Sequence, residues 1–286
     1  MLKGVSKKSL FLSLGVVTCV VIGGCSSSKE REAAANMLEE ARVCLDGGRY
    51  GDALAIVDSL PVLYPGETDA RRSAMMLRPL IIEHATMCEI EQCDSLITSA
   101  RERYRQAKEA MKKVENPELV EGYWVAVKGS GQPLMDRTGI EARVSDDGEF
   151  YVVSEVNAAG NLHHSSITLS LPSGENASSG MVPYDGELNY RLNGSETVTF
   201  SWENVDSLGR FAVSHSGEAM TLTFCGDNGA SKKIKLSPDE VSAIASAYEM
   251  ASAQREGKNL MASRQLLERK LALARDQQKR MENKLD

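Results

Sequence analysis

Three of the four histidines have chemistry that could make a site, because imidazole nitrogens bind metal ions and carry protons near neutral pH. His163 and His164 are adjacent in a polar segment between two predicted strands, and His215 follows later in the chain. Together they could hold a zinc ion. Side chains of adjacent residues in an extended segment point apart, however, and nothing in the sequence brings His215 to them. We therefore predict exposed loop histidines, and neither a metal nor a cofactor.

The chain has enough serines for a Ser–His–Asp triad to be formed in principle, but the sequence lacks the motifs that usually accompany catalysis. No Gly-x-Ser-x-Gly elbow stands between a predicted strand and a predicted helix. No glycine-rich phosphate loop precedes a helix. We therefore predict a protein without catalytic activity.

Four cysteines lie beyond the N-terminal segment: Cys44, Cys88, Cys93 and Cys225. Cys88 and Cys93 are separated on a predicted helix by more than the ~7 Å between Cα atoms that a disulfide spans. Two double pairings remain, Cys44–Cys88 with Cys93–Cys225 and Cys44–Cys93 with Cys88–Cys225. Four free, mostly buried thiols are the other interpretation, and the sequence leaves the disulfide state open.

Aromatic side chains of the central region could stack on the rings of a sugar. Several alternate with polar residues, which predicts that they point into a core: Phe200, Trp202, Phe211 and Phe224. Tyr123, Trp124 and Tyr151 have no assigned core face. We predict these three as the candidate ligand-binding residues.

The composition indicates a folded protein that does not bind nucleic acid. The chain has 286 residues, which allows one or two domains, and a formal net charge of −7. Charged residues make up 26% and the mean hydropathy is −0.28, as in soluble folded proteins. An acidic chain without a basic stripe does not attract phosphate backbones.

Helical periodicity begins at Ala33 and continues to Pro65-Gly66, with an interruption at Gly47-Gly48. Two helices joined by a short glycine turn form a hairpin, which we place at residues 35–66.

This hairpin resembles one tetratricopeptide repeat, on residues at the spacing of that motif: Ala41, Gly48, Tyr50, Ala53, Leu60 and Pro65. The resemblance implies that the two alanines allow the helices to approach closely and that Gly48 makes the turn. Met37 stands where the repeat usually has tryptophan, and Cys44 where it has an aromatic residue. Since one repeat cannot form a solenoid, we expect the hairpin to pack on the helix that follows.

Residues 67–116 predict a long helix that is broken near Pro79, where a proline removes a helical hydrogen bond. Beyond Pro79 a heptad pattern indicates a coiled coil. One seam is formed by Ile90, Ile97, Tyr104 and Met111. The other seam is formed by Cys93, Ala100, Ala107 and Val114.

A second helix, at residues 237–286, begins with Ser237-Pro238-Asp239-Glu240, which is a capping sequence. The sequence does not decide whether these helices pair within one chain or between chains.

Between the long helices, residues 118–236 alternate apolar and polar side chains, as strands with one buried face do. Asp147-Gly148, Asn193-Gly194 and Asn228-Gly229 are hairpin turn sequences. We therefore predict an α+β fold in which an N-terminal helical hairpin and long coiled-coil-like helices flank an inserted antiparallel β sandwich or barrel.

The N-terminal segment predicts export from the cytoplasm. Residues 1–24 have a basic start, an apolar run too short for a confident membrane span, and small residues before Cys25. Ile22-Gly23-Gly24-Cys25 resembles a bacterial lipobox. The resemblance implies cleavage before Cys25, diacylation of its thiol and acylation of the new amino group. Residues 25–34 would then be a polar tether to the membrane.

Asp-Ser-Leu occurs three times, with its serine at Ser59, Ser95 and Ser207. The triplet resembles the O-glycosylation acceptor of exported Bacteroidota proteins, which implies that these serines can carry sugar. Ser207 is expected in a loop. The layout as a whole resembles envelope lipoproteins of the Bacteroidota that have one tetratricopeptide-like hairpin.

These observations lead to two hypotheses for function. The first is a lipid-anchored scaffold or adaptor of the outer membrane, facing the periplasm or the cell surface, whose helices bind a protein partner. The alternative is a lipoprotein whose β domain binds a glycan or a small ligand.

Overall fold

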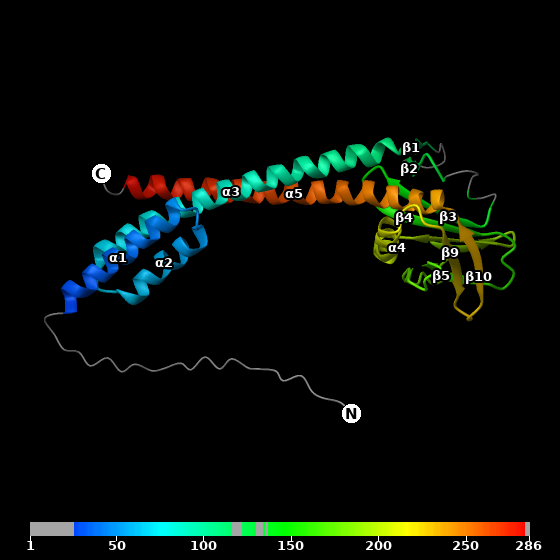
Figure 1. Cartoon of the computed structure of the whole chain (residues 1–286), viewed down its shortest axis with the longest axis horizontal. Helices are drawn as coiled ribbons and strands as arrows, with labels where there is room; N and C mark the ends of the chain where they lie inside the picture. The colour runs from blue at the N-terminus through cyan, green and yellow to red at the C-terminus, as the bar shows by residue number, and fades with distance from the viewer. Residues whose placement is uncertain (1–25, 116–121, 130–133, 135–136, 284–286) are drawn as a thin grey trace, which may run out of the picture. The chain divides into compact units, whose positions relative to one another are not determined.

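The computed structural model describes residues 26–115, 122–129, 134 and 137–283 (Figure 1). It confirms the α+β class, because helices at both ends of the described chain flank two antiparallel sheets. The chain divides into two compact units, residues 1–86 with 271–286, and residues 87–270. The predicted signal peptide and the predicted lipidation site, Cys25, lie outside the described residues.

The described part of the first unit is helical. It contains α1 (Ser26–Asp46), α2 (Tyr50–Leu63), the beginning of α3 (Thr68–Glu109) and the end of α5 (Pro238–Glu282). Ala41 and Ala53 are fully buried between α1 and α2, and Gly48 takes a positive φ of 71° in the turn. Ala74 and Ile81 of α3 complete the same core. The hairpin therefore packs on the following helix, as expected.

Two local expectations in this unit were wrong. Helix α1 begins at Ser26, so the segment predicted as a tether is helical; Lys29 to Glu32 consists of helix-forming residues without glycine or proline. Helix α3 is not broken at Pro79. Pro79 is itself buried, and Ala74 and Ile81 on either side of it join one core. That packing outweighs the local cost of the proline.

In the second unit, the heptad seam of α3 is buried against α5. Cys93, Ile97 and Ala100 are buried. The Cys93 thiol donates a hydrogen bond to the Leu260 carbonyl at 3.3 Å. Ion pairs join the two helices, Arg103–Glu256 at 2.6 Å, Asp94–Arg264 at 2.5 Å and Glu89–Lys270 at 3.0 Å. Here the long helices pair within one chain.

The predicted helix extends too far at its C-terminal end. Met111–Val114 form strand β1, paired with β2 (Tyr123–Ala126), instead of continuing the seam to Val114. Met111 lies opposite Ala126 and is buried in the core of the strands. Pairing with β2 therefore overrides the heptad pattern, which by itself carries no information about a neighbouring strand.

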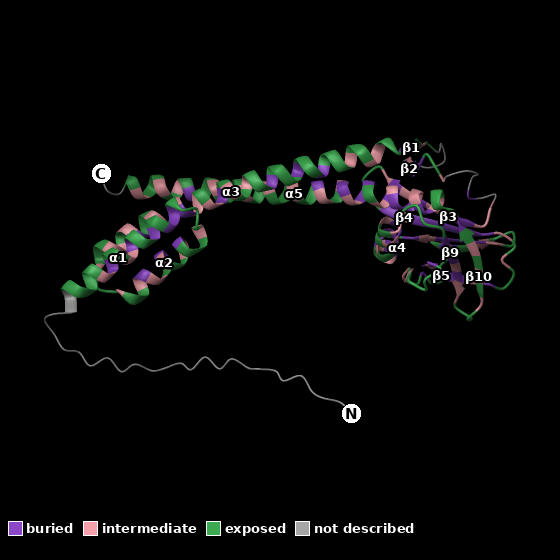
Figure 2. Ribbon diagram, viewed as in Figure 1, coloured by how far each residue is buried: buried purple, intermediate pink, exposed green. Residues whose placement is uncertain are grey.

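The strands form two antiparallel sheets around a common core (Figure 2). The first has the order β1-β2-β3-β4-β8-β7, with β3 (Gly139–Ser145), β4 (Phe150–Val156), β7 (Asn189–Leu192) and β8 (Ser195–Phe200). The second has the order β10-β9-β5-β6, with β5 (His164–Ser170), β6 (Asn176–Ser178), β9 (Met220–Gly226) and β10 (Ser231–Leu236). Positive φ at Gly148, Gly194 and Gly229 makes the predicted turns.

Helix α4 (Trp202–Ser214) was missed by the sequence interpretation. The alternation at Val198, Phe200 and Trp202 predicted that the strand continues, but the helix begins at Trp202. Its buried residues, Val205, Leu208 and Ala212, recur at helical spacing. Phe200, Trp202 and Phe224 are buried as predicted, whereas Phe211 is half-buried.

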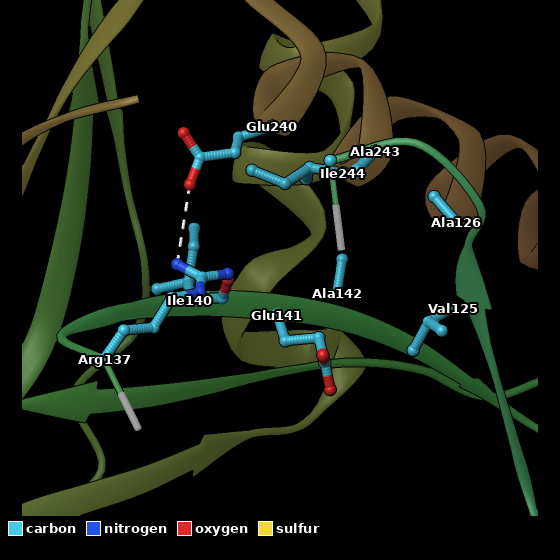
Figure 3. A pocket seen from close by; sticks show the side chains of 10 residues that line it. Val125, Ala126, Arg137, Ile140, Glu141, Ala142, Glu240, Ala243 and Ile244 are labelled. Atoms are coloured by element: carbon cyan, nitrogen blue, oxygen red, sulfur yellow. Dashed lines mark hydrogen bonds and ion pairs between the residues drawn. The ribbon is translucent and has the colours of Figure 1, made fainter. Parts of the chain in front are cut away.

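Helix α5 brings its N-terminal turns onto the first sheet. Ile244 lies near Ala142 of β3 (Figure 3), and both belong to the core of the second unit. The predicted capping sequence forms: the Glu240 carboxylate accepts the Ser237 amide at 2.9 Å, and the Ser237 hydroxyl accepts the Glu240 amide at 3.3 Å.

Candidate functional site

A buried chain of hydrogen bonds joins the two sheets. The Ser154 hydroxyl of β4 is 2.8 Å from His164 Nε2 of β5, and His164 Nδ1 is 2.9 Å from the Glu196 carboxylate of β8. Ser154 and His164 are fully buried. The prediction that His164 lies exposed in a loop was therefore wrong. A bulge between His164 and Ser166 interrupts the alternation of β5, which explains why its pattern did not reveal the buried imidazole.

Glu196 also accepts the amides of His163 and His164, at 2.6 and 2.7 Å. His163 has a φ of 54°, and this left-handed conformation allows two successive amides to converge on one carboxylate. Burial alone would raise the pKa of Glu196, but the hydrogen bonds from His164 and from the two amides lower it. Burial lowers the pKa of His164, although Glu196 opposes the shift. The imidazole is therefore neutral, with Nδ1–H donating to Glu196.

This order of groups is that of a nucleophile, a base and an acid in serine hydrolases. Here no substrate reaches it, because the Ser154 and His164 side chains have no exposed surface. In the observed conformation the hydrogen bonds among these three residues connect the two sheets.

We expect the second unit to lose stability as the pH falls below about 6.5, the ordinary pKa of histidine. The lowered pKa of folded His164 means that its neutral form stabilises the fold above that pH, and that this contribution is lost on acidification. The raised pKa of the buried Glu155 has the opposite effect. Urea unfolding measured at pH 8 and at pH 5 should show that the free energy of unfolding falls less in His164→Gln than in the native chain. An equal fall in both proteins would contradict the contribution of neutral His164 to stability.

The other predicted metal ligands do not join His164. His163 is half-buried, and His215 Nδ1 is 3.0 Å from Glu218 Oε1, beyond the end of α4. In the part of the chain that the structure describes, no group of three histidine, cysteine or acidic residues could hold a metal ion. The cysteines Cys44, Cys88, Cys93 and Cys225 are free thiols, so neither double pairing is present.

The predicted ligand-binding residues divide between two faces of the first sheet. The Arg143 guanidinium lies 4.3 Å from the centre of the Tyr123 ring, and Arg143 pairs in register with Tyr151. Trp124, next to Tyr123 on β2, points to the other face. On that face Lys108 Nζ is 4.6 Å from the centre of the Trp124 ring, and the Trp124 indole N–H donates to Asp146 at 3.2 Å. Cations of the same chain therefore already contact the Tyr123 and Trp124 rings.

The three serines of the Asp-Ser-Leu triplets are all in helices. Ser59 is half-buried in α2 and donates to the Ile56 carbonyl at 2.9 Å, and Ser95 is exposed on α3. Ser207 is exposed on α4 instead of in a loop, and donates to the Ser178 carbonyl at 2.8 Å. The structure does not test whether they are glycosylated.

One hollow at the N-terminus of α5 is too small for a ligand (Figure 3). Arg137 and Glu240 line it at a separation of 3.5 Å, together with Ile140, Ala142 and Ile244. Its volume of about 20 Å³ holds one water molecule.

Two larger hollows between helices share Tyr248 and Ser252 of α5 in their linings. We call the two hollows together the Tyr248 cleft. Its first hollow, of about 460 Å³, is lined from α3, α4 and α5 by Arg103, Gln106, Ala107, Val213 and Glu249, among others, and by Ala110 just beyond the end of α3. Its second hollow, of about 380 Å³, is lined from α4 and α5 by Trp202, Asp206, Arg210, Arg255, Glu256 and Asn259, among others. Volumes of this size accommodate side chains or a small ligand.

Asp206 organises the second hollow. It accepts hydrogen bonds from the Tyr248 hydroxyl at 2.7 Å and the Trp202 indole at 3.0 Å, and pairs with Arg210 at 2.5 Å. Burial would raise the pKa of Asp206, but these partners lower it. The Arg255 guanidinium lies 4.7 Å from the centre of the Trp202 ring. The Trp202, Asp206 and Tyr248 side chains are therefore held in place by one another before any ligand arrives.

Sequence reasoning missed this cleft because its residues are far apart in the chain and belong to three helices, one of them unpredicted.

Comparisons with protein-family models, curated proteins and solved structures find no match. None of the helices in the described ranges is long and apolar enough to span a membrane.

Proposed function

We propose that the chain is a lipid-anchored scaffold or adaptor of the bacterial outer membrane, without catalytic activity, which binds a protein partner through its helices. Lipidation of Cys25 would supply the anchor, on the basis of the lipobox resemblance. The observation that carries the binding role is the Tyr248 cleft, which is open to solvent and is lined by aromatic, apolar and charged side chains. Such mixed surfaces are typical of protein recognition.

The first unit adds a second reason to favour a partner. Val62 and Leu63 at the end of α2 are 78% and 59% exposed, and Met75 of α3 is 58% exposed. Val62 and Leu63 are adjacent in the chain, and neighbouring apolar side chains on a surface suit contact with another protein.

The alternative is a glycan or a small ligand at the β domain. It is supported by Tyr123 and Tyr151, which lie on one face of the sheet with Arg143. Saturable binding of a sugar that is lost on Tyr151→Phe or Tyr123→Ala would favour this function over the adaptor.

Site-specific cross-linking in intact cells tests the adaptor. A photoreactive residue replaces Gln106 or Asn259, which line the two hollows, or Lys235, which is exposed on β10 as a matched control. We expect one protein to be cross-linked from Gln106 and Asn259 and not from Lys235. The proposal fails if no protein is captured at the cleft, or if Lys235 captures the same proteins equally well.

A further inference from the structure

Arg255 lines the second hollow, and no carboxylate of the described residues forms an ion pair with it. The two other arginines of the Tyr248 cleft have carboxylate partners, Arg103 with Glu256 at 2.6 Å and Arg210 with Asp206 at 2.5 Å. Arg255 instead lies over the Trp202 ring. A guanidinium held on an aromatic face keeps its N–H groups for an incoming acceptor and loses little freedom when one binds.

The negative groups of the cleft do not cancel this charge. Three donors already engage Asp206, and Arg103 engages Glu256. Glu249 is exposed on the lining of the first hollow. The one arginine that lines the first hollow, Arg103, is already paired, so an incoming carboxylate is attracted instead to Arg255 in the second hollow.

The first hollow presents three small apolar side chains, Ala107, Ala110 and Val213. These groups suit an aliphatic side chain better than the hydroxyl groups of a sugar. Tyr248 lines both hollows, so an occupant that fills both passes over one aromatic ring.

We propose that the Tyr248 cleft binds a peptide segment of the partner in which an acidic side chain pairs with Arg255 and a neighbouring aliphatic side chain enters the first hollow. The inference rests on the proposed adaptor function and specifies the chemistry of its partner. A sugar acid has the same carboxylate but lacks the aliphatic group, so it becomes an outcome of the test.

The two tryptophans of the chain make the test specific. Trp202 lies in the cleft, whereas Trp124 is outside its lining and donates to Asp146. The full chain is labelled with nitrogen-15 in tryptophan, and the two indole signals are assigned with Trp124→Phe. The probes are acetyl-Leu-Glu-Leu-Glu-Leu-amide, its counterpart with glutamine in place of glutamate, and glucuronate.

We expect the glutamate peptide to shift the Trp202 signal saturably and to leave the Trp124 signal in place. Arg255→Gln should weaken this binding about tenfold, the usual effect of one charge-assisted pair. Arg269→Gln, at an exposed position of the same helix, should leave it unchanged.

Three results would overturn the inference: equal binding of the glutamine peptide, no effect of Arg255→Gln, or a Trp202 shift with glucuronate alone. A partner that still cross-links from Asn259 in cells while neither peptide binds would leave the adaptor standing and reject only the acidic peptide.

Discussion

Replacing Glu196 by alanine should lower the free energy of unfolding of the second unit by about 3–5 kcal/mol. The substitution leaves three donors without their acceptor, the buried ring N–H and amide of His164 and the amide of the half-buried His163. Each unsatisfied buried donor costs about 1–3 kcal/mol. Both tryptophans lie in this unit, so urea unfolding followed by tryptophan fluorescence reports its stability directly.

Glu218→Ala is the matched control. Glu218 also pairs with a histidine, at 3.0 Å from His215, but its side chain is 57% exposed, so its loss should change stability by less than about 1 kcal/mol. If Glu196→Ala lowered the free energy of unfolding no more than this control does, the Ser154–His164–Glu196 hydrogen bonds would not hold the two sheets together.

Gly209→Ala should destabilise the same unit by about 1–3 kcal/mol through overpacking. A Cβ atom built on Gly209 of α4 would overlap the Tyr248 ring of α5, so the helices must separate or the ring must move. Movement of the ring would also disturb its hydrogen bond to Asp206. Thermal unfolding measures the first effect, and the Trp202 indole signal, which depends on Asp206, measures the second.

Gly257→Ala provides a control with the opposite expected sign. The nearest atom to a Cβ on Gly257 is the Ala100 Cβ at 4.0 Å, which is an ordinary contact. Alanine inside a helix stabilises by about 0.5–1 kcal/mol relative to glycine. Equal effects of the two substitutions would mean that α4 and α5 do not require the close approach at Gly209.

Local signals in the sequence predicted much of the fold. The Asn-Gly and Asp-Gly pairs located the hairpins, because only residues that accept positive φ make such turns. The seam at Cys93, Ile97 and Ala100 identified the buried face of α3. The capping pattern at Ser237 located the start of α5.

The missed features depend on contacts between distant residues. Met111 has a position in the heptad, and only its pairing with Ala126 places it in a strand. The bulge next to His164 breaks the period of two on which the prediction of a buried strand face depends. The Tyr248 cleft combines residues from α3, α4 and α5. No spacing along one element could therefore have predicted it.

Hydrogen exchange of the full chain, alone and with the protein cross-linked from Asn259, tests the central claim most directly. The account predicts slower exchange on binding in α4 and in α5 near Tyr248 and Arg255, because a partner in the Tyr248 cleft covers these two helices. Protection confined to the strands that carry Tyr123 and Tyr151, with none in α4 or α5, would contradict it.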